Sequence, residues 1–101
     1  PISAYIHHGN YEQALLEAYE TASAAARVPL YQKLVDPLTS LEALWEFENL
    51  FVLSGQTNGS WVNLLVTFET LKSGAADETT AQTALEQARE FISYCEKFSA
   101  A

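Results

Sequence analysis

The chain has 101 residues, 49% of them apolar and 18% charged, which is typical of one globular domain spanning residues 1–101. Its 5 basic and 13 acidic residues give a net charge of −8, so it lacks the clustered cations that bind nucleic-acid backbones or anionic membranes. The longest run of large apolar residues, Leu50 to Leu53, is far shorter than the ~20 residues that span a bilayer. Because Cys95 is the one cysteine, no internal disulfide can form, and we expect a soluble, cytoplasmic protein.

The first predicted element is an amphipathic helix over residues 10–26. Its apolar residues share an arc of about 140° on a helical wheel, and most of them are alanines, so a second helix can approach closely. Pro29 suits the first position of a helix, which predicts a separate helical turn over residues 29–35. Within that turn, Leu30 and Leu34 are expected to form an i, i+4 pair.

Residues 4–15 carry a further pattern. Ala4-Tyr5, Gly9-Asn10-Tyr11 and Ala14-Leu15 resemble the turn and adjoining helices of a tetratricopeptide repeat, in which small and aromatic residues lie where two helices cross. No second copy follows at the repeat period of about 34 residues. The resemblance therefore implies a local helical hairpin in this part of the chain.

A second long helix is predicted over residues 37–53. Asp36 can act as its N-cap with Pro37 in the first helical position, and Gly55 can end it. Nine of its last thirteen residues, from Leu41 to Leu53, are apolar. Because its polar stripe is only about 60° wide, most of its circumference needs to be covered by the rest of the chain or by a second molecule.

Glu48 is the unusual residue of this helix, because it is a charged residue on the otherwise apolar side of the helical wheel. A buried carboxylate without a partner shifts its pKa upward or destabilises the fold. We therefore expect Glu48 either to pair with Arg89, Lys72 or a tyrosine hydroxyl or to lie at a helix edge. A contact with a partner protein and a role as a catalytic acid are the alternatives.

A third helix is predicted over residues 60–73, because the apolar residues from Trp61 to Leu71 share an arc of about 120°. Alternate residues from Val62 to Phe68 are also apolar. A strand paired through the turn at Asn58-Gly59 is therefore the competing interpretation.

The last predicted helix covers residues 77–98. Asp77 can cap its start, and Lys97 lies in its last turn, where the helix dipole favours a cation. Its apolar residues are spaced alternately three and four apart, which predicts lengthwise packing against a neighbouring helix: Ala81, Ala84, Ala88, Phe91, Cys95 and Phe98, with Leu85 and Ile92 beside them. The four main helices and the one short helical turn together predict a small all-α, single-domain bundle.

No catalytic, metal-binding or cofactor-binding group is evident in the sequence. His7 and His8 are adjacent and so point in different directions, which is poor geometry for a shared metal. Cys95 lies at an apolar helix position without cationic neighbours, so we expect a buried thiol with a raised pKa. Because no second catalytic group accompanies Glu48, we expect a protein that is not an enzyme and that carries no cofactor.

The prediction for function is a non-enzymatic interaction module, such as a small chaperone, adaptor, inhibitor or immunity protein, that binds a protein partner through an apolar helix face with an acidic rim. The acidic charge is explained either by solubility or by recognition of a basic partner. The predicted interface combines hydrophobic anchors with carboxylates: Trp45, Phe47, Phe51 and Trp61, with Glu42, Glu46 and Glu48. Core packing is the alternative explanation for each aromatic residue. A self-assembling subunit, of a homodimer or a viral particle, is the second functional class, and a small helical enzyme using Glu48 is the third.

Overall fold

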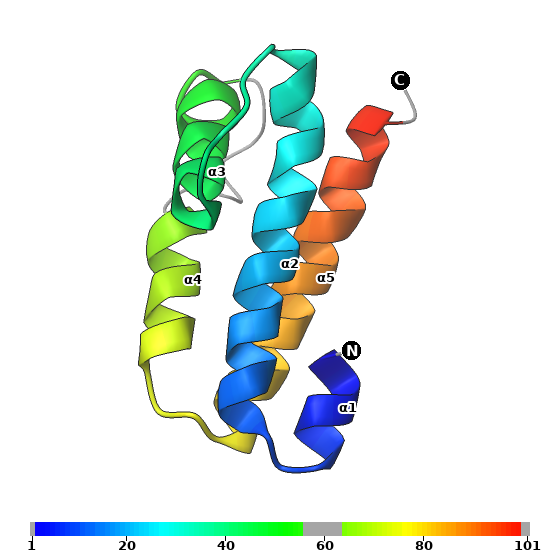
Figure 1. Cartoon of the computed structure of the whole chain (residues 1–101), viewed down its shortest axis with the longest axis vertical. Helices are drawn as coiled ribbons and strands as arrows, with labels where there is room; N and C mark the ends of the chain where they lie inside the picture. The colour runs from blue at the N-terminus through cyan, green and yellow to red at the C-terminus, as the bar shows by residue number, and fades with distance from the viewer. Residues whose placement is uncertain (1, 56–63, 100–101) are drawn as a thin grey trace.

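The computed structural model describes residues 2–55 and 64–99, and all regular secondary structure in these ranges is helical. The elements are α1 (Ile2–His7), α2 (Tyr11–Gln32), α3 (Ser40–Phe47), the π-helical turn η1 (Glu48–Val52), α4 (Leu64–Ser73) and α5 (Glu78–Ser99) (Figure 1). The predicted all-α bundle is therefore confirmed. It contains one short helix, α1, that only the hairpin resemblance implied.

Two long helices, α2 and α5, form the centre of the bundle and run parallel to each other (Figure 1). On the buried ridge of α2, alanine recurs every fourth residue: Ala14, Ala18, Ala22 and Ala26. The buried side of α5 also carries small side chains: Ala81, Ala84 and Ala88. Because these ridges end in methyl groups, the two helix axes can approach closely, as the alanine-rich pattern predicted.

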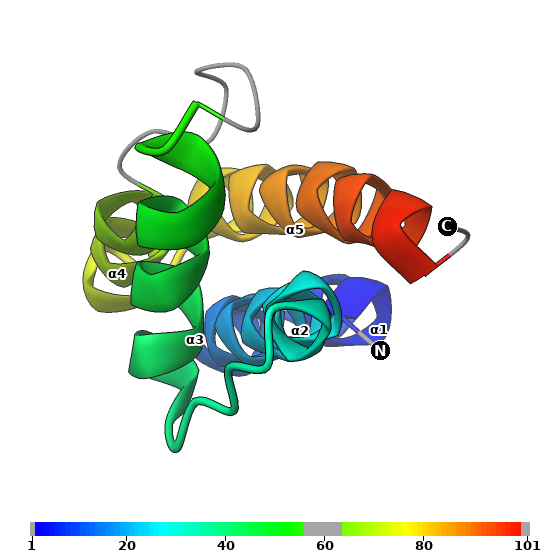
Figure 2. The same ribbon diagram turned by 90° about the horizontal axis from the view of Figure 1, so that it is seen from above.

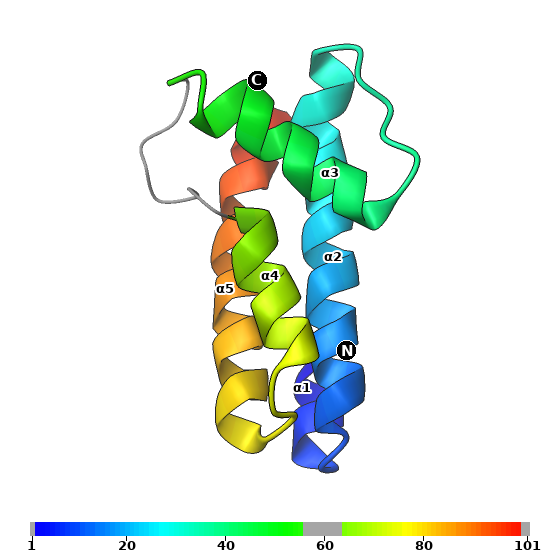
Figure 3. The same ribbon diagram turned by 90° about the vertical axis from the view of Figure 1, so that its left-hand side faces the viewer.

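The remaining helices pack on two sides of this pair. On one side α1 runs antiparallel to α2 and contacts both α2 and α5. On the other side α4 runs antiparallel to α2. α3 crosses the bundle near the C-terminal end of α2 and contacts both α2 and α4 (Figure 2 and Figure 3). Aromatic rings close the core between the layers, where Phe47 stacks on Phe51 at 5.1 Å between centroids and meets Phe91 edge to face at 4.9 Å.

The turn between α1 and α2 is the hairpin implied by residues 4–15. The Gly9 N–H donates to the Ile6 carbonyl at 3.1 Å, and the Asn10 N–H donates to the Tyr5 carbonyl at 2.7 Å. These two bonds make a Schellman turn, and Gly9 has the positive φ, 77°, that the turn requires. The turn folds α1 back so that its two isoleucines are buried.

α2 continues through Pro29, so the predicted separate turn over residues 29–35 was wrong. Proline lacks the N–H that would bond to the carbonyl one turn earlier, a defect that costs about 3 kcal/mol in a helix interior. Pro29 and Leu30 are both fully buried, and their packing offsets the lost hydrogen bond. The predicted pair of Leu30 with Leu34 was also wrong, because Leu34 is 95% exposed.

α2 ends in a second Schellman turn, in which Leu34 takes the place of the usual glycine. The Leu34 N–H donates to the Tyr31 carbonyl at 3.0 Å, and the Val35 N–H donates to the Leu30 carbonyl at 2.9 Å. Leu34 has a φ of 62°, a left-handed conformation that costs a residue with a Cβ atom roughly 1–2 kcal/mol. Since no glycine marks this position, composition alone did not reveal where α2 ends.

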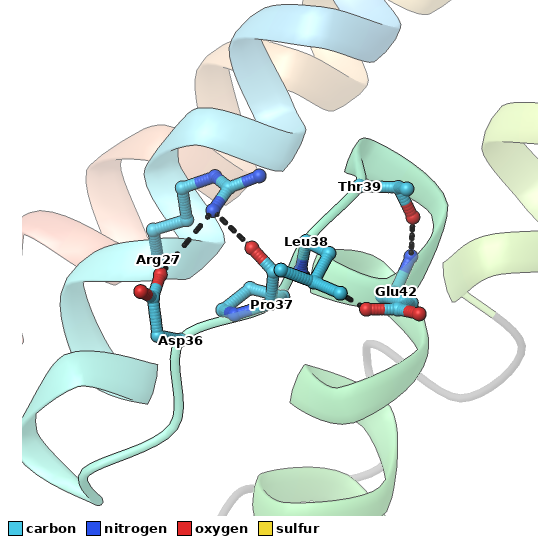
Figure 4. Close-up of polar contacts among 6 residues, drawn as sticks. All are labelled: Arg27, Asp36, Pro37, Leu38, Thr39 and Glu42. Atoms are coloured by element: carbon cyan, nitrogen blue, oxygen red, sulfur yellow. Dashed lines mark hydrogen bonds and ion pairs between the residues drawn. The ribbon is translucent and has the colours of Figure 1, made fainter.

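α3 begins at Ser40, later than the predicted start at residue 37, because its N-cap is Thr39 and not Asp36. The Thr39 hydroxyl oxygen accepts a hydrogen bond from the Glu42 N–H at 3.1 Å, and Glu42 Oε2 accepts one from the Leu38 N–H at 3.0 Å (Figure 4). The pair resembles a capping box, whose sequence pattern is Thr-x-x-Glu, except that Glu42 accepts from the N–H of Leu38, the residue before the N-cap. This pattern is present at residues 39–42 and prevails over the Asp-Pro signal before it.

The same helix widens at its end into the π-helical turn η1. The Leu53 N–H donates to the Glu48 carbonyl, five residues earlier, at 2.9 Å. Gly55 follows with a φ of 83°, which confirms the predicted end of the helix at this glycine. The wider turn changes the direction of the residues after Glu48, and Phe51 and Val52 are both buried.

α4 and α5 agree with the remaining predictions. Residues Leu64–Ser73 are helical, so the competing strand was wrong for them, while residues 60–63 lie outside the described ranges. At the start of α5, Asp77 Oδ1 accepts a hydrogen bond from the Thr80 N–H at 2.8 Å, which confirms the predicted N-cap. The same hydrogen bond lowers the pKa of Asp77 below its ordinary value.

A polar contact in the core joins α4 to α2. Tyr19 of α2 is buried, and its side chain forms a hydrogen bond with Glu69 of α4. Burial is the largest cause that raises the pKa of Tyr19 above its ordinary value of 10.0. The hydrogen bond to Glu69 and the negative charge of Glu69 raise it further. The contact helps to set the position of α4 along α2.

Candidate functional site: the outward side of α3

Three large apolar side chains are exposed in succession at the start of α3. Leu38 is 86% exposed, Leu41 is 49% exposed and Trp45 is 52% exposed. Leu41 and Trp45 are four residues apart and so lie on one side of α3, while Leu38 lies in the loop just before the N-cap Thr39. The opposite side of α3 is fully buried: Ala43, Leu44 and Phe47. A row of exposed apolar side chains on a helix that is otherwise well packed is a candidate binding surface.

Acidic side chains border this row. Glu42 is exposed and lies one helical turn before Glu46, which is half-buried. Glu48 is half-buried at the junction of α3 and η1. These three carboxylates, with the three exposed apolar side chains, form what we call the α3 face. Glu42 and Glu46 are one turn apart, so their like charges repel each other and concentrate negative charge on the α3 face.

Glu48 lies at a helix edge, which was one of the structural outcomes expected for it. Its carbonyl accepts the π-turn hydrogen bond from Leu53, and its side chain is half-buried. Within the described ranges, no ion pair joins Glu48 to Arg89, which is exposed on α5. The predicted pair with Arg89 is therefore not formed, and the Lys72 side chain lies outside the description.

Two of the predicted hydrophobic anchors are core residues. Phe47 and Phe51 are buried and stack on each other, so they are removed from the predicted interface and fit the core-packing alternative. Trp45 precedes Phe47 by two residues, and a shift of two residues turns a side chain by about 200°, to the opposite side of the helix. Trp45 is consequently the exposed aromatic of α3, whereas Trp61 lies outside the described residues.

Long-range contacts that the sequence did not reveal fasten the α3 face to α2. The Arg27 Nη1 donates to the Pro37 carbonyl at 2.6 Å and lies 3.9 Å from the Asp36 Oδ1 (Figure 4). The Ser40 hydroxyl donates to Glu20 Oε2 at 2.7 Å. The two hydrogen bonds join residues 10 and 20 positions apart, so no local pattern identifies them. The one local signal for this region is the Thr-x-x-Glu capping pattern at residues 39–42.

The other candidate groups in the sequence do not form a site. His7 and His8 are both exposed, with their rings edge to face at 5.3 Å. In the part of the chain that the structure describes, no three His, Cys, Asp or Glu side chains are placed to hold a metal. Cys95 is buried, and burial raises the pKa of its thiol to about 12, which confirms the prediction for this residue.

Comparison of the chain with protein families, curated proteins and solved structures gave no match. Over residues 2–55 and 64–99, no helix combines the length and the apolar character that crossing a membrane requires.

Proposed function

We propose that this chain is a non-enzymatic module that binds a basic protein partner through the α3 face. The half-exposed indole of Trp45 carries the proposal. Tryptophan offers a large apolar surface together with an N–H donor, and it is among the residues that contribute most to protein–protein binding. Leu41 extends the apolar surface on the same side of α3, and the exposed Leu38 adds apolar surface in the loop just before the helix.

The distribution of charge supports a basic partner. The chain carries a net charge of −8, and three of its carboxylates belong to the α3 face. A field of one sign accelerates the encounter with a partner of the opposite sign and excludes partners of the same sign. Lys or Arg side chains of the partner would meet Glu42 and Glu46, while its apolar side chains would pack on Trp45.

The α3 face is also held in one conformation before binding. Arg27 fixes the loop before α3 through the Pro37 carbonyl, and Thr39 and Glu42 cap the helix. A surface that is already ordered loses less conformational entropy when a partner binds. This order supports recognition by α3 without rearrangement of the bundle.

A second copy of the chain is the alternative occupant of the α3 face. The exposed apolar stripe favours self-association as readily as it favours a partner protein. A two-fold contact would, however, place two copies of Glu42, Glu46 and Glu48 close together, and their repulsion opposes it. The self-assembling subunit is therefore the second candidate function.

Fluorescence of Trp45 tests the proposal in a Trp61→Phe background, which leaves one indole in the chain. The probe is a capped amphipathic helical peptide of leucine and lysine, and the control peptide has glutamate in place of lysine. We expect the lysine peptide to shift the Trp45 emission to shorter wavelength, with an affinity that falls as salt rises. Glu46→Lys should weaken this binding roughly fivefold or more. Glu86→Lys makes the same charge change at an exposed position of α5 and should weaken it far less.

Equal binding of the two peptides, or an equal loss in the two variants, would contradict recognition through the α3 face. Light scattering of the free protein at several concentrations decides between the two occupants. A concentration-dependent dimer that dissociates in Trp45→Ala would replace the basic partner by a second copy of the chain.

A further inference from the structure

The two sides of the α2–α5 pair are covered to different extents. α3 and α4 pack on one side (Figure 3), whereas on the other side α1 lies against the N-terminal end of α2 (Figure 1). α1 has 6 residues, and α2 and α5 have 22 each. At 1.5 Å per residue, α1 is about 9 Å long and the pair is about 33 Å long. Much of the second side therefore has no described helix packed over it.

The uncovered part of this side is an apolar groove between α2 and α5, with a volume of about 330 Å³. Small side chains of α2 form one wall, namely Thr21, Ala24 and Ala25, and Ile92 and Cys95 of α5 form the other, with Glu96 at the rim. We call this the α2–α5 groove.

The groove faces away from α4. Val28, which also lines it, follows Tyr19 by nine residues, and nine residues correspond to about 180° around a helix. Tyr19 forms the hydrogen bond with Glu69 of α4, so Val28 lies on the opposite side of α2. The groove is thus separate from the α3 face and its supporting helices.

The α2–α5 groove continues the surface on which α1 packs. On α5, Leu85 and Ile92 lie seven residues apart on one stripe, and Leu85 is buried whereas Ile92 is only half-buried. On α2, Ala14 and Ala25 lie about three turns apart on one stripe, and Ala14 is buried whereas Ala25 is half-buried. The same two stripes are therefore covered at one end of the pair and open at the other.

We propose that the α2–α5 groove binds an amphipathic helix of a partner protein, in line with α1 and carrying an apolar i, i+4 pair of the kind that Ile2 and Ile6 form in α1. The small side chains of α2 let such a helix approach closely. A second copy of the groove is a poor fit, because two concave surfaces placed together enclose a void. Basic residues beside the apolar pair complement the net charge of −8.

A peptide titration followed by NMR of the backbone amides tests the inference. The probe is a capped helix of about 16 residues, built on alanine and lysine, with one Ile-x-x-x-Ile pair. The control peptide has serine in place of both isoleucines. We expect shifts at residues 21–28 and 92–96, and an affinity for the serine peptide that is roughly tenfold weaker or lower still.

Matched variants assign the binding to the groove. Val28→Lys and Ile92→Asn should each weaken the isoleucine probe roughly tenfold. Val66→Lys, at an exposed position of α4, should leave its affinity unchanged. Trp45→Ala should also leave it unchanged, which separates this groove from the α3 face.

Four outcomes would overturn the inference. The first is the absence of shifts at millimolar probe, and the second is equal binding of the isoleucine and serine peptides. The third is a set of chemical-shift changes centred on residues 2–7, which would mean that the probe displaces α1 from the surface of α2 and α5 on which it packs. A dimer that Val28→Lys dissociates would likewise replace the partner helix by a second copy of the chain.

Discussion

Leu34 at the end of α2 occupies the same backbone position as Gly9 at the end of α1. Both residues donate the corresponding hydrogen bond of a Schellman turn, and both have a positive φ, 62° and 77° respectively. Only Gly9 lacks the Cβ atom that makes this conformation costly. The two helix ends are therefore suited to substitutions with opposite expected effects.

Leu34→Gly should raise the free energy of unfolding by about 1 kcal/mol, because it relieves the left-handed strain. The Leu34 side chain is almost fully exposed, so its removal forfeits little buried surface. Urea denaturation of the two proteins measures the change. A lower midpoint for Leu34→Gly would show that the extra freedom of glycine in the unfolded chain outweighs the relief of strain.

Gly9→Ala should lower the free energy of unfolding by about 1 kcal/mol. No atom lies within 4 Å of a Cβ built on Gly9, so the expected cost comes from the backbone alone. Gly9→Asn is the control, since asparagine tolerates the left-handed region better and should lose less. If alanine and asparagine cost the same in urea denaturation, the backbone explanation is wrong.

Thr39→Ala should destabilise the protein by about 1 kcal/mol, because it removes the acceptor that caps α3. Thr83→Ala provides the contrast. Thr83 lies inside α5 and donates to the Thr79 carbonyl, and alanine has the higher helix propensity there. We expect thermal melts to show a lower midpoint for Thr39→Ala and an equal or higher midpoint for Thr83→Ala.

Phe47 and Trp45 should respond very differently to truncation. Phe47→Ala leaves a cavity among stacked rings and should cost roughly 3–5 kcal/mol. Trp45→Ala removes a side chain that is already half-exposed and should cost well under half as much. Similar denaturation midpoints for the two variants would contradict the assignment of Phe47 to the core and Trp45 to the surface.

The free energy of unfolding should fall as the pH rises above about 9. The folded protein holds the Cys95 thiol protonated, with a pKa of about 12, while the unfolded chain has the ordinary value of 9.0. Between these pKa values the unfolded chain binds fewer protons than the folded protein, so a rise in pH favours unfolding. Below pH 9.0 the thiol is protonated in both states, and the stability that buried Cys95 provides is fully present. The raised pKa of Tyr19 acts in the same direction above its ordinary value of 10.0.

Cys95→Ala isolates this contribution. The variant should lose part of the decline in stability between about pH 9 and pH 10, where the unfolded thiol ionises first. Urea denaturation of both proteins from pH 7 to pH 10 provides the comparison. Parallel curves for the variant and the parent would exclude Cys95 as a source of the pH dependence.

The helices that the sequence predicted well are those whose signals are local. α5 combines a capping aspartate with regular apolar spacing. The structure confirms the cap and buries the stripe from Ala81 to Cys95, while the Phe98 side chain lies outside the described part of the chain. The errors arose where packing, or a second local signal, prevailed over a local rule. Pro29 normally starts a helix, yet here its burial in the core keeps it inside α2. Asp36 resembles an N-cap, yet it lies beside Arg27 while Thr39 caps the helix.

The candidate site was predictable only in part for the same reason. The combination of tryptophan and glutamates on one helix was visible in the sequence, and so was the excess of apolar residues that leaves one side of α3 exposed. Periodicity alone left open whether Phe47 or Trp45 points outward, since both lie on an unusually wide apolar arc. The contacts of Arg27 and Ser40 were out of reach, because they depend on how the chain folds back on α2.

The sequence by itself determined that this chain is helical, acidic and able to bury an alanine-rich ridge, because these properties depend on residue type and spacing within a few helical turns. Only the tertiary structure decided which apolar side chains remain exposed. That outcome depends on the angle at which α3 crosses the bundle and on how far α1 extends along α2 and α5. Those positions are set by packing and hydrogen bonds between residues far apart in the chain, so no local pattern encodes them.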